Sequence, residues 1–409
     1  MMKILLISQF HPPEMEPSGF MFSSLAEHLS KKVDYKVHLI SGFTNFPDGR
    51  FINWDFLKIF SSRNFKGYKN HNVIVYPSSN KNNINRILNY VSFMISSFIR
   101  GILIFRVDKI LVTSPPIFSG ISALFLSKLK NVPYIIDIRD IWPESAIQMG
   151  NLKNSLLIKI FTWIEKKLYA NAESITVATP GMVDDIHAKL SKMGIFDIPV
   201  KFIPCGINIY SHNELQEYGQ RSSCIDTFDD KFIVLYAGLH GLAQNLKSVI
   251  DAAALIKNEE IVFIFIGDGP EKLKLIDYAN KINVKNLHFF DPVERNDIRT
   301  IYCKVNTAIV PLRDLDVFKT VFPSKTFELL SFKIPTIVGV GGEISELLTK
   351  KSAALCVQPD DSLGYSKAIT ELYESKDLYE KISFNGRKLT EEMFDYKITN
   401  NQFKEIIGN

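Results

Sequence analysis

Two side chains of opposite charge, Lys325 and Glu328, stand three residues apart in a segment that predicts a short helix. The helix follows the apolar run 307–311, begins at Pro323-Ser324 and is stopped by Pro335. Because residues three apart share one face of a helix, both groups can reach a single ligand. A helix N-terminus with a lysine attracts phosphate, and a carboxylate one turn further in can accept hydrogen bonds from sugar hydroxyls. The pattern indicates a nucleotide-sugar site; an ordinary helix with both side chains facing water is the alternative.

The order strand, glycine-bearing loop, helix recurs in two successive series along the 409 residues, which predicts two Rossmann-like α/β domains. In the first series, the backbone at Ser18-Gly19 can approach a phosphate or form a packing turn. No GxGxxG follows the first strand, so a nicotinamide cofactor is not expected. The expected division is residues 1–205 with a returning helix at about 392–409, a polar linker at 206–230, and a second domain at 231–391.

The composition limits the class of protein. Hydrophobic residues make up 46% and charged residues 22%, as in a globular chain with a full core. The net charge of +4 is too small to indicate a nucleic-acid partner. The four cysteines lie far apart without CxxC spacing, which suggests neither a zinc site nor disulfides and favours a reducing cytoplasm. The first residues predict a buried strand and not a signal peptide.

Loops that contain glycine follow the first two strands of the second series, 232–237 and 261–266. Glycine lets such a loop pass close to a ligand. Open α/β sheets bind ligands at the carboxyl ends of their strands, where both loops stand. The glycines are Gly238 and Gly241 in the first loop and Gly267 and Gly269 in the second.

Polar residues also follow the strand 133–137 of the first series. Arg139, Asp140 and Glu144 could bind, orient or deprotonate a hydroxylated acceptor at the carboxyl end of that strand. The alternative is structural, with Arg139 paired to Asp140 and Trp142 filling the core. The residue types alone leave both interpretations open.

Residues 84–105 form an apolar helical pattern with a narrow polar stripe. Serines and Arg100 interrupt the pattern, which argues against a transmembrane span. Two interpretations remain: a helix buried against the sheet, or a helix that dips into a bilayer surface, with Phe93, Met94 and Phe98 touching lipid. The polar stripe comprises Asn85, Asn89, Ser92, Ser96 and Arg100, and the basic residues that could assist membrane contact are Lys81, Arg86, Arg100 and Arg106.

Three groups of residues resemble family 4 of the retaining glycosyltransferases, which have the GT-B fold. The first is P-S-K-x-F-E-L-L at 323–330, followed by K-I-P-T-I-V and G-G-E. The second is D-I-R-D-I-W-P-E-S at 137–145, and the third combines Q-x-H-P-P-E at 9–14 with G-F-T-N-F-P-D-G-R at 42–50. The last two resemble the WbuB-type branch, which makes O-antigen and colanic-acid repeat units. The resemblance covers most of the chain and implies two lobes facing across a cleft, with the last helix crossing back to the first.

The resemblance also implies roles. Glu328 would hold the donor ribose, and loop amides before the helix would hold the pyrophosphate. From the residues themselves, we expect Lys325 to meet the charge of the leaving group and Asp140 to be the best side-chain candidate for a base, with the departing phosphate as the alternative base. Many relatives have a sugar-contacting glutamate where this chain has Thr320. The implied donor-binding residues are Ser18, Gly19, Gly238, His240, Gln244, Gly267, Gly269, Pro292, Val293, Thr320, Val321, Phe322, Pro323, Ser324, Lys325 and Glu328, and the implied acceptor-binding residues are His11, Arg139, Asp140, Trp142 and Glu144.

The implied reaction moves a sugar from a UDP-sugar co-substrate, such as UDP-N-acetyl-L-fucosamine, to a polyprenyl-pyrophosphate-linked saccharide at the inner face of the plasma membrane. Neither a metal nor another cofactor is implied. One alternative is a sugar-nucleotide 2-epimerase, which needs carboxylates and histidines facing the donor; the second half offers His240, Glu328, Glu343 and Glu346. The other alternative is a non-catalytic nucleotide-binding scaffold. Thr320 would fit it, and so would the loop 239–245, which lacks the arginine that clamps the pyrophosphate in many relatives.

Overall fold

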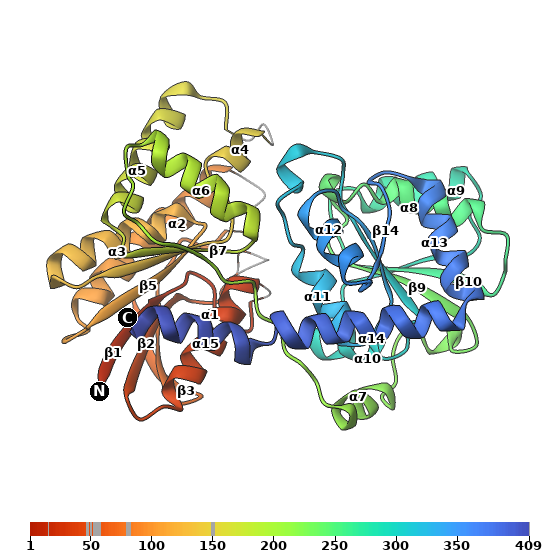
Figure 1. The fold of residues 1–409 in the computed structure, drawn as a ribbon, viewed down its shortest axis with the longest axis horizontal. Coiled ribbons are helices and arrows are strands. Elements are labelled where there is room, and N and C mark those ends of the chain that lie inside the picture. Colours follow the sequence, from red (N-terminus) through yellow and green to blue (C-terminus); the bar gives the residue numbers. More distant parts are fainter. Residues whose placement is uncertain are drawn as a thin grey trace. The chain divides into compact units, whose positions relative to one another are not determined.

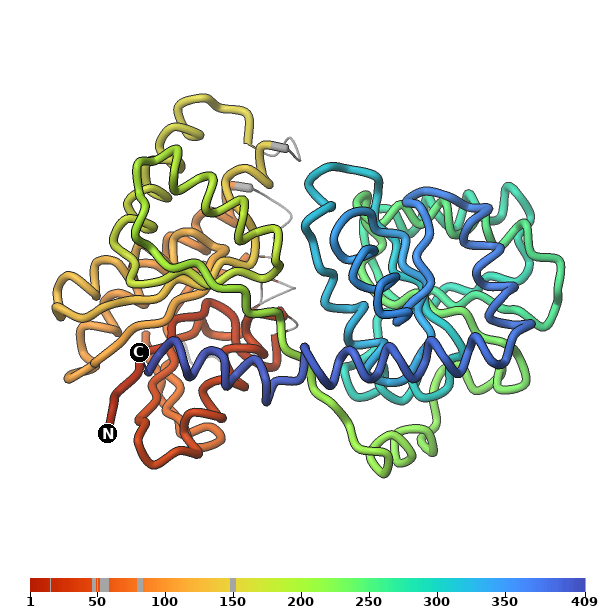
Figure 2. Tube along the Cα trace, viewed as in Figure 1, coloured from red at the N-terminus to blue at the C-terminus, as the bar shows by residue number. Residues whose placement is uncertain are grey.

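The computed structural model describes residues 1–14, 16–45, 49, 51, 59–78, 83–148 and 152–408 (Figure 1). The chain forms two compact units, Met1–Gly206 with Tyr396–Asn409, and Ile207–Asp395. Lys81 and residues 46–48 and 50 of the aromatic loop lie outside the described residues. In Figure 2 the last helix, in dark blue, can be followed back to the residues of the first unit.

The first unit is built on a sheet that has eight strands in the described residues, in the order β3-β4-β2-β1-β5-β6-β7-β8. Neighbouring strands are parallel except β3 and β4. Since β2 and β5 lie on opposite sides of β1, the carboxyl ends of β1 and β5 form a topological switch point. The strands are β1 (Met2–Ile7), β2 (Tyr35–Gly42), β3 (Phe60–Phe65), β4 (Tyr68–Val73), β5 (Lys109–Ser114), β6 (Tyr134–Ile138), β7 (Ser174–Val177) and β8 (Val200–Phe202).

Helices cover both faces of this sheet, because alternate strand residues supply two apolar cores. One core contains Ile4 and Leu6 and is closed by α1 (Pro17–Ser30) and the returning helix α15 (Tyr396–Gly408). The other contains Leu5 and Ile7 and is closed by the remaining helices. These are α2 (Asn83–Ile102), α3 (Ile117–Lys130), α4 (Glu144–Gln148), α5 (Ser155–Asn171) and α6 (Pro180–Lys192).

The second unit holds a parallel sheet with six strands in the described residues, in the order β11-β10-β9-β12-β13-β14. Here β10 and β12 lie on opposite sides of β9, so the switch point falls between the carboxyl ends of β9 and β12. The strands are β9 (Phe232–Ala237), β10 (Ile261–Ile266), β11 (Leu287–Phe290), β12 (Thr307–Pro311), β13 (Thr336–Gly339) and β14 (Leu355–Cys356).

The helices of the second unit also pack on both faces of their sheet. One core joins α8, α9 and α13 to the sheet, and the other face carries α10, α11 and α12. The helices are α7 (His212–Gly219), α8 (Leu246–Leu255), α9 (Lys272–Lys281), α10 (Arg295–Tyr302), α11 (Ser324–Ser331), α12 (Glu343–Lys350), α13 (Ser362–Glu374) and α14 (Lys376–Met393), with short 3-10 turns η1 (Asp226–Phe228), η2 (Leu242–Gln244) and η3 (Asp316–Phe318).

Residues 207–230, expected as a polar and irregular linker, belong to the second unit and contain α7 and η1. A capping box explains the start of α7: the Ser211 side chain accepts the Glu214 amide N–H, and the Glu214 carboxylate accepts the Ser211 amide N–H. Ile225 is fully buried in the core of this unit. The segment is therefore ordered despite its polar composition, with Ile225 in the core and Tyr210, Leu215 and Phe228 packed against that core.

The helix expected at 84–105 spans Asn83–Ile102, and Phe93 is fully buried in the core of the first unit. Of the two interpretations of this helix, the one that buries it against the sheet therefore describes Phe93, whose side chain lies in the core and does not touch lipid. Phe98 is half-buried and packs on Phe125 of α3. Among the described helices, none combines the length and the apolar character needed to cross a bilayer.

Candidate functional site

The carboxyl edge of the second sheet brings the loops after β9, β10 and β12 together. The amide N–H of His240 donates to the Asp268 carbonyl at 2.9 Å, and the amide N–H of Glu271 donates back to the His240 carbonyl at 3.0 Å. The Arg313 amide N–H donates to the Ala243 carbonyl at 2.9 Å, which ties the loop after β12 to the same place. These backbone bonds hold the switch point of the sheet as one assembly.

Gly267 and Gly269 allow this close approach. Gly267 has φ +145°, and a Cβ there would lie 1.9 Å from the Gly238 carbonyl oxygen. A Cβ on Gly269 would lie 2.4 Å from the His240 carbonyl oxygen. These two glycines, which were expected to make room for a nucleotide, make room for the loop after β9. Their contact with this loop sets the position of His240.

The His240 ring is fully buried among the aromatic side chains of Tyr236, Phe265 and Phe289. Burial, reinforced by the charge of Lys272, lowers the pKa of His240 to about 4, so the ring is neutral at pH 7. Neither ring nitrogen has a hydrogen-bond partner among the described residues. A buried imidazole in this state is a candidate to hydrogen-bond a bound group.

Lys325 lies in the first turn of α11, as the sequence predicted, and it has two partners. Its Nζ donates to Glu328 Oε2 at 3.0 Å and to the Tyr302 hydroxyl at 2.9 Å. Burial by itself would lower the pKa of Lys325, but the Tyr302 hydroxyl and the Glu328 carboxylate outweigh it and hold the pKa above its usual value. Lys325 is therefore a permanent cation at the start of a helix.

The N-terminus of α11 has Pro323 at the N-cap, and no side chain of the described residues caps it. The Thr326 amide N–H donates to the Pro323 carbonyl at 2.9 Å, so the first-turn amides left for water or a ligand are those of Ser324 and Lys325. Thr320 and Ser324 are half-buried beside this turn, and Val321 is partly exposed. Phe322 instead packs toward Phe327 in the core, with ring centroids 5.8 Å apart.

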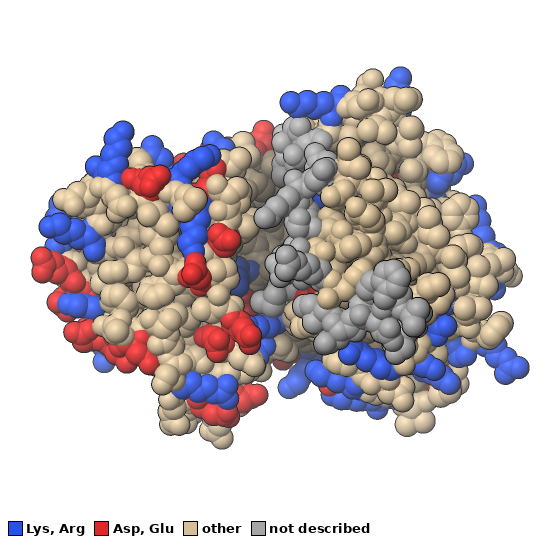
Figure 3. Space-filling view, turned by 180° about the vertical axis from the view of Figure 1, so that it is seen from behind, with Lys and Arg blue, Asp and Glu red and all other residues tan. Residues whose placement is uncertain are grey.

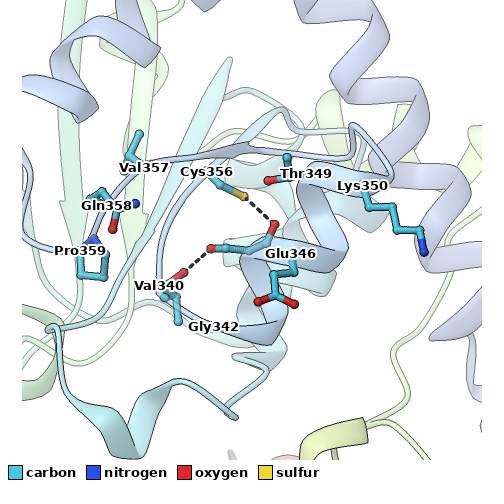
Figure 4. Close-up of a pocket in the computed structure, with 11 residues that line it drawn as sticks. Val340, Gly342, Glu346, Thr349, Lys350, Cys356, Val357, Gln358 and Pro359 are labelled. Atoms are coloured by element: carbon cyan, nitrogen blue, oxygen red, sulfur yellow. Dashed lines mark hydrogen bonds between the residues drawn. The ribbon is translucent and has the colours of Figure 1, made fainter.

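The loop after β13 meets the segment before α11. The Glu343 amide N–H donates to the Lys319 carbonyl at 3.0 Å, and a Cβ on Gly342, whose φ is +80°, would lie 2.1 Å from the same oxygen. Beside this contact, a pocket of about 580 Å³ lies between residues 340–342, α12 and residues 356–359 (Figure 4). Glu346 lines this pocket, but His240 and Glu328 do not, so the pocket does not gather the residues that a 2-epimerase would need.

The sequence did not lead us to three residues at this site, Lys272, Arg313 and Tyr302. Lys272 donates to the Phe290 carbonyl at 3.1 Å and to Asp291 at 2.7 Å, which fixes the end of β11 before Pro292 and Val293. Arg313 is exposed at the end of β12. No sequence motif marks any of these three residues. The only sequence features that pointed to this region were the predicted strand ends at residues 290 and 311.

In the first unit, the residues expected at the acceptor side have structural partners. Arg139 forms two hydrogen bonds to the fully buried Asp137 and a third to the Ile203 carbonyl at 2.9 Å. The ring of Trp142 packs edge-on against Phe161 at 4.4 Å between centroids. Trp142 therefore packs in the core, as the structural alternative predicted. Arg139 is also paired with a carboxylate, but with that of Asp137 and not that of Asp140.

Asp140 and Glu144 are placed differently from each other. The Ser145 hydroxyl donates to Asp140 at 2.8 Å, and burial raises the pKa of Asp140. Glu144 instead pairs with Lys189, which also bonds the buried Glu165. Asp140 therefore keeps acid–base character, whereas Glu144 is engaged in an ion pair.

His11 is buried, with Nδ1 2.7 Å from the Pro12 carbonyl and Nε2 2.9 Å from the Tyr68 hydroxyl. Because a carbonyl only accepts, Nδ1 carries the proton and Nε2 accepts from Tyr68. Burial lowers the pKa of His11 to about 4.

Gly19 lies in α1, and a Cβ there would lie 2.9 Å from the Phe10 carbonyl carbon. Of the two interpretations of Ser18-Gly19, the structure therefore contains the packing turn. The Ser18 side chain beside Gly19 is half-buried.

Comparison with known proteins gives the class first. Residues 225–389 match the family model described as "Glycosyl transferases group 1". Two solved structures are similar over the whole chain: sucrose-phosphate synthase from Thermosynechococcus elongatus (TM-score 0.74, 15% identity, 100% of this chain and 98% of that one) and Anabaena HepE in complex with UDP and glucose (TM-score 0.70, 13% identity, 100% of both chains). The expected α/β class with the GT-B fold is confirmed.

Individual relatives share a somewhat larger fraction of identical residues with this chain. WcaI of Escherichia coli (strain K12), whose name assigns it a glycosyl transferase role in colanic acid biosynthesis, is 22% identical over 373 residues, which is 88% of this chain and 89% of WcaI. WbjE of Pseudomonas aeruginosa, named as a glycosyltransferase, is 21% identical over 321 residues, covering 73% of this chain and 75% of WbjE. Together with the family match over residues 225–389, these relatives support a glycosyltransferase.

Proposed function

We propose that the chain is a retaining glycosyltransferase that moves a sugar from a UDP-sugar to an acceptor hydroxyl. The observation that carries the proposal is the cluster of Lys325, Glu328 and Tyr302 at the uncapped start of α11, on the ligand-binding edge of the second sheet. Residues 231–391 would bind the donor and residues 1–205 the acceptor. The structural relative crystallised with UDP and glucose has the same fold, which supports a nucleotide-sugar donor.

In the reaction, the bond between the anomeric carbon and the donor phosphate breaks, and UDP leaves with the bonding electrons. The acceptor oxygen forms the new bond to the anomeric carbon on the face from which UDP departs, so the anomeric configuration is retained. Lys325 and the free amides of α11 meet the negative charge that grows on the pyrophosphate. Glu328 accepts hydrogen bonds from the ribose hydroxyls, and the backbone at Pro292 and Val293 lies by the base. Neutral His240 donates a hydrogen bond to the bound donor without adding charge. Neither a metal ion nor another cofactor is required by this scheme.

The acceptor hydroxyl loses its proton to the leaving phosphate or to Asp140, whose burial-raised pKa favours proton uptake. The acceptor is a polyprenyl-pyrophosphate-linked saccharide, and the donor sugar is an N-acetylated deoxy amino sugar such as L-FucNAc, as in the WbuB-type branch. This assignment places the protein on the cytoplasmic face of the plasma membrane in O-antigen or capsule synthesis. The names of WcaI and of a further relative, the O-antigen chain mannosyltransferase C of Escherichia coli, support this setting.

The test is a panel of UDP-sugars incubated with the protein and a polyprenyl-pyrophosphate monosaccharide, with the product identified by mass. We expect one donor to give a disaccharide, with UDP released only when the acceptor is present. UDP release without acceptor, together with an altered sugar, would instead identify a 2-epimerase. UDP binding without turnover on any acceptor would identify a scaffold.

A further inference from the structure

The helix α2 is oriented with its polar stripe toward the protein interior. Asn89 and Ser96 are 4% and 5% exposed. The Asn89 amide donates to the Tyr76 carbonyl at 2.6 Å, and the Ser96 hydroxyl donates to the Ile74 carbonyl at 2.7 Å. Arg100 bonds the buried His71. These side chains satisfy backbone groups at and beyond the end of β4, so the polar stripe does not face solvent.

The opposite face of α2 is apolar and exposed. Leu88, Ile95 and Ile99 are 44%, 50% and 45% exposed. Their spacings of seven and four residues place them in one stripe along the helix. An ordinary surface helix buries its apolar stripe and exposes its polar one. The helix α2 buries its polar stripe together with Phe93 and leaves this further apolar stripe exposed, which is expected where the outer medium is itself apolar.

The neighbouring helices α3 and α5 continue this surface. The Phe98 ring of α2 packs on Phe125 of α3 at 6.1 Å between centroids, and the Phe118 ring of α3 packs on Phe161 of α5 at 6.1 Å. Exposed apolar side chains follow on both helices. They are Phe125 and Leu129 on α3, and Leu156, Leu157, Ile160 and Trp163 on α5, with Trp163 61% exposed. We call the outer side of α2, α3 and α5 the apolar face.

Apart from Glu165, the charged residues of these three helices are basic. Their basic residues number seven, and their acidic residue is Glu165, which is buried against Lys189. The Lys167 amine lies over the Trp163 ring at 5.9 Å. The basic residues are Arg86, Arg100, Lys128, Lys130, Lys159, Lys166 and Lys167. In Figure 3 the first unit, on the right of the view, presents a broad uncharged area with Lys and Arg around its margin.

We propose that the apolar face docks on the surface of an anionic lipid bilayer, with its aliphatic and aromatic side chains at the depth of the headgroups. The apolar stripe supplies the hydrophobic contact, and the lysines are attracted to the anionic lipid. A second copy of the chain fits this face less well, because both copies would bring the same positive charge. The inference names the membrane contact of the proposed transferase, but its test needs neither donor nor acceptor.

The experiment uses the full chain and sedimentation with vesicles of phosphatidylethanolamine and phosphatidylglycerol, compared with vesicles of phosphatidylcholine. The wild type is expected to bind the anionic vesicles, and added salt is expected to weaken the binding. The triple variant Leu88→Ser, Ile95→Ser, Ile99→Ser is expected to bind at least tenfold more weakly. The variant Lys159→Gln, Lys166→Gln, Lys167→Gln is expected to lose the preference for anionic lipid.

The matched control is Leu273→Ser with Phe384→Ser, two exposed apolar residues of the second unit, which should bind vesicles like the wild type. The thermal unfolding midpoint and UDP affinity of each variant are measured in parallel, so that a folding defect is recognised. Vesicle binding by the folded serine variant at the wild-type level would overturn the proposal. A wild-type dimer that the same variant dissociates, without vesicle binding, would assign the face to a second copy and overturn it too. Loss of vesicle binding with glycosyl transfer to a short-chain acceptor retained would support the docking face independently of the catalytic proposal.

Discussion

Lys325 and Glu328 form an ion pair on the first turn of α11, with Nζ 3.0 Å from Oε2. The two side chains are 39% and 26% exposed, so the pair is open to a ligand on one side and supported by Tyr302 on the other. This arrangement keeps the lysine charged and fixed before any ligand arrives. Such preorganisation reduces the rearrangement needed when negative charge develops on a leaving group.

Replacing Glu328 with glutamine should weaken UDP binding. Glutamine keeps the size of the side chain and an oxygen for Lys325, but it removes the negative charge that accepts ribose hydroxyl hydrogens. A hydrogen bond to a charged group is worth about 1.5–3 kcal/mol. We expect isothermal titration with UDP to show a loss in this range. The control is Asp277→Asn, an exposed carboxylate on α9, and equal UDP affinities for Glu328→Gln and the wild type would refute the ribose role.

Replacing Lys325 with alanine should lower turnover more than donor affinity. The lysine neutralises charge that appears mainly in the transition state, and loss of one such group typically costs about 10²–10³ in kcat. Lys325→Arg retains the charge and should fall between the wild type and the alanine variant. The measurement compares kcat with the dissociation constant for the UDP-sugar. A larger effect on the dissociation constant would reduce Lys325 to a binding residue.

The sequence predicted the parts of the site that depend on local spacing. Pro323 and Ser324 start α11 as expected, and the three-residue step puts Lys325 and Glu328 on one face. The partner of Lys325, Tyr302, is 23 residues away on another helix, and only the tertiary fold brings it close. Local patterns therefore gave the helix start and the positions of the two charges, but not the residues that support them.

The misassigned pair in the first unit has a simple cause. Side chains two apart along an extended chain lie on the same side, so Arg139 reaches Asp137 and not Asp140. Alternation could have given this partner. The orientation of α2 is a different case: periodicity identified its polar and apolar stripes, but both stripes are compatible with packing on a sheet. Which one turns inward was decided by the unpaired backbone beyond β4, which no local pattern records.

Replacing Gly267 with alanine should destabilise the second unit and weaken UDP binding together. The residue has φ +145°, and the added Cβ would overlap the Gly238 carbonyl oxygen at 1.9 Å. We expect a loss of about 2–4 kcal/mol in the free energy of unfolding, seen as a lower thermal midpoint. The control is Gly194→Ala, where φ is +72° but no atom lies within 4 Å, so that backbone strain alone costs about 1 kcal/mol. Equal losses for the two variants would mean that the close contact with the β9 loop is unimportant.

The buried histidine pair of the first unit should make its stability fall in mild acid. His38 and His71 stack with their rings 5.1 Å apart, and His71 Nε2 lies 2.8 Å from His38 Nδ1. Arg100 donates to His71 Nδ1, so Nε2 of His71 carries the proton and donates to His38. Protonating either ring would place two donors against each other or against the Arg100 guanidinium.

Burial lowers the pKa of His38 to about 4 and that of His71 to about 3, from an ordinary value of 6.5. A group whose pKa is depressed on folding contributes stability that is full above pH 6.5 and is lost as the pH falls toward the folded value. Between pH 7 and pH 5, each histidine should remove about 1–2 kcal/mol from the free energy of unfolding of the first unit. Thermal unfolding followed at both pH values measures this change. The double variant His38→Asn, His71→Asn should reduce the pH dependence and leave the part contributed by the buried His11, whereas His212→Gln, an exposed histidine on α7, should leave it unaltered. A wild-type midpoint that does not fall between pH 7 and pH 5 would mean that the pair does not stay neutral in the folded chain.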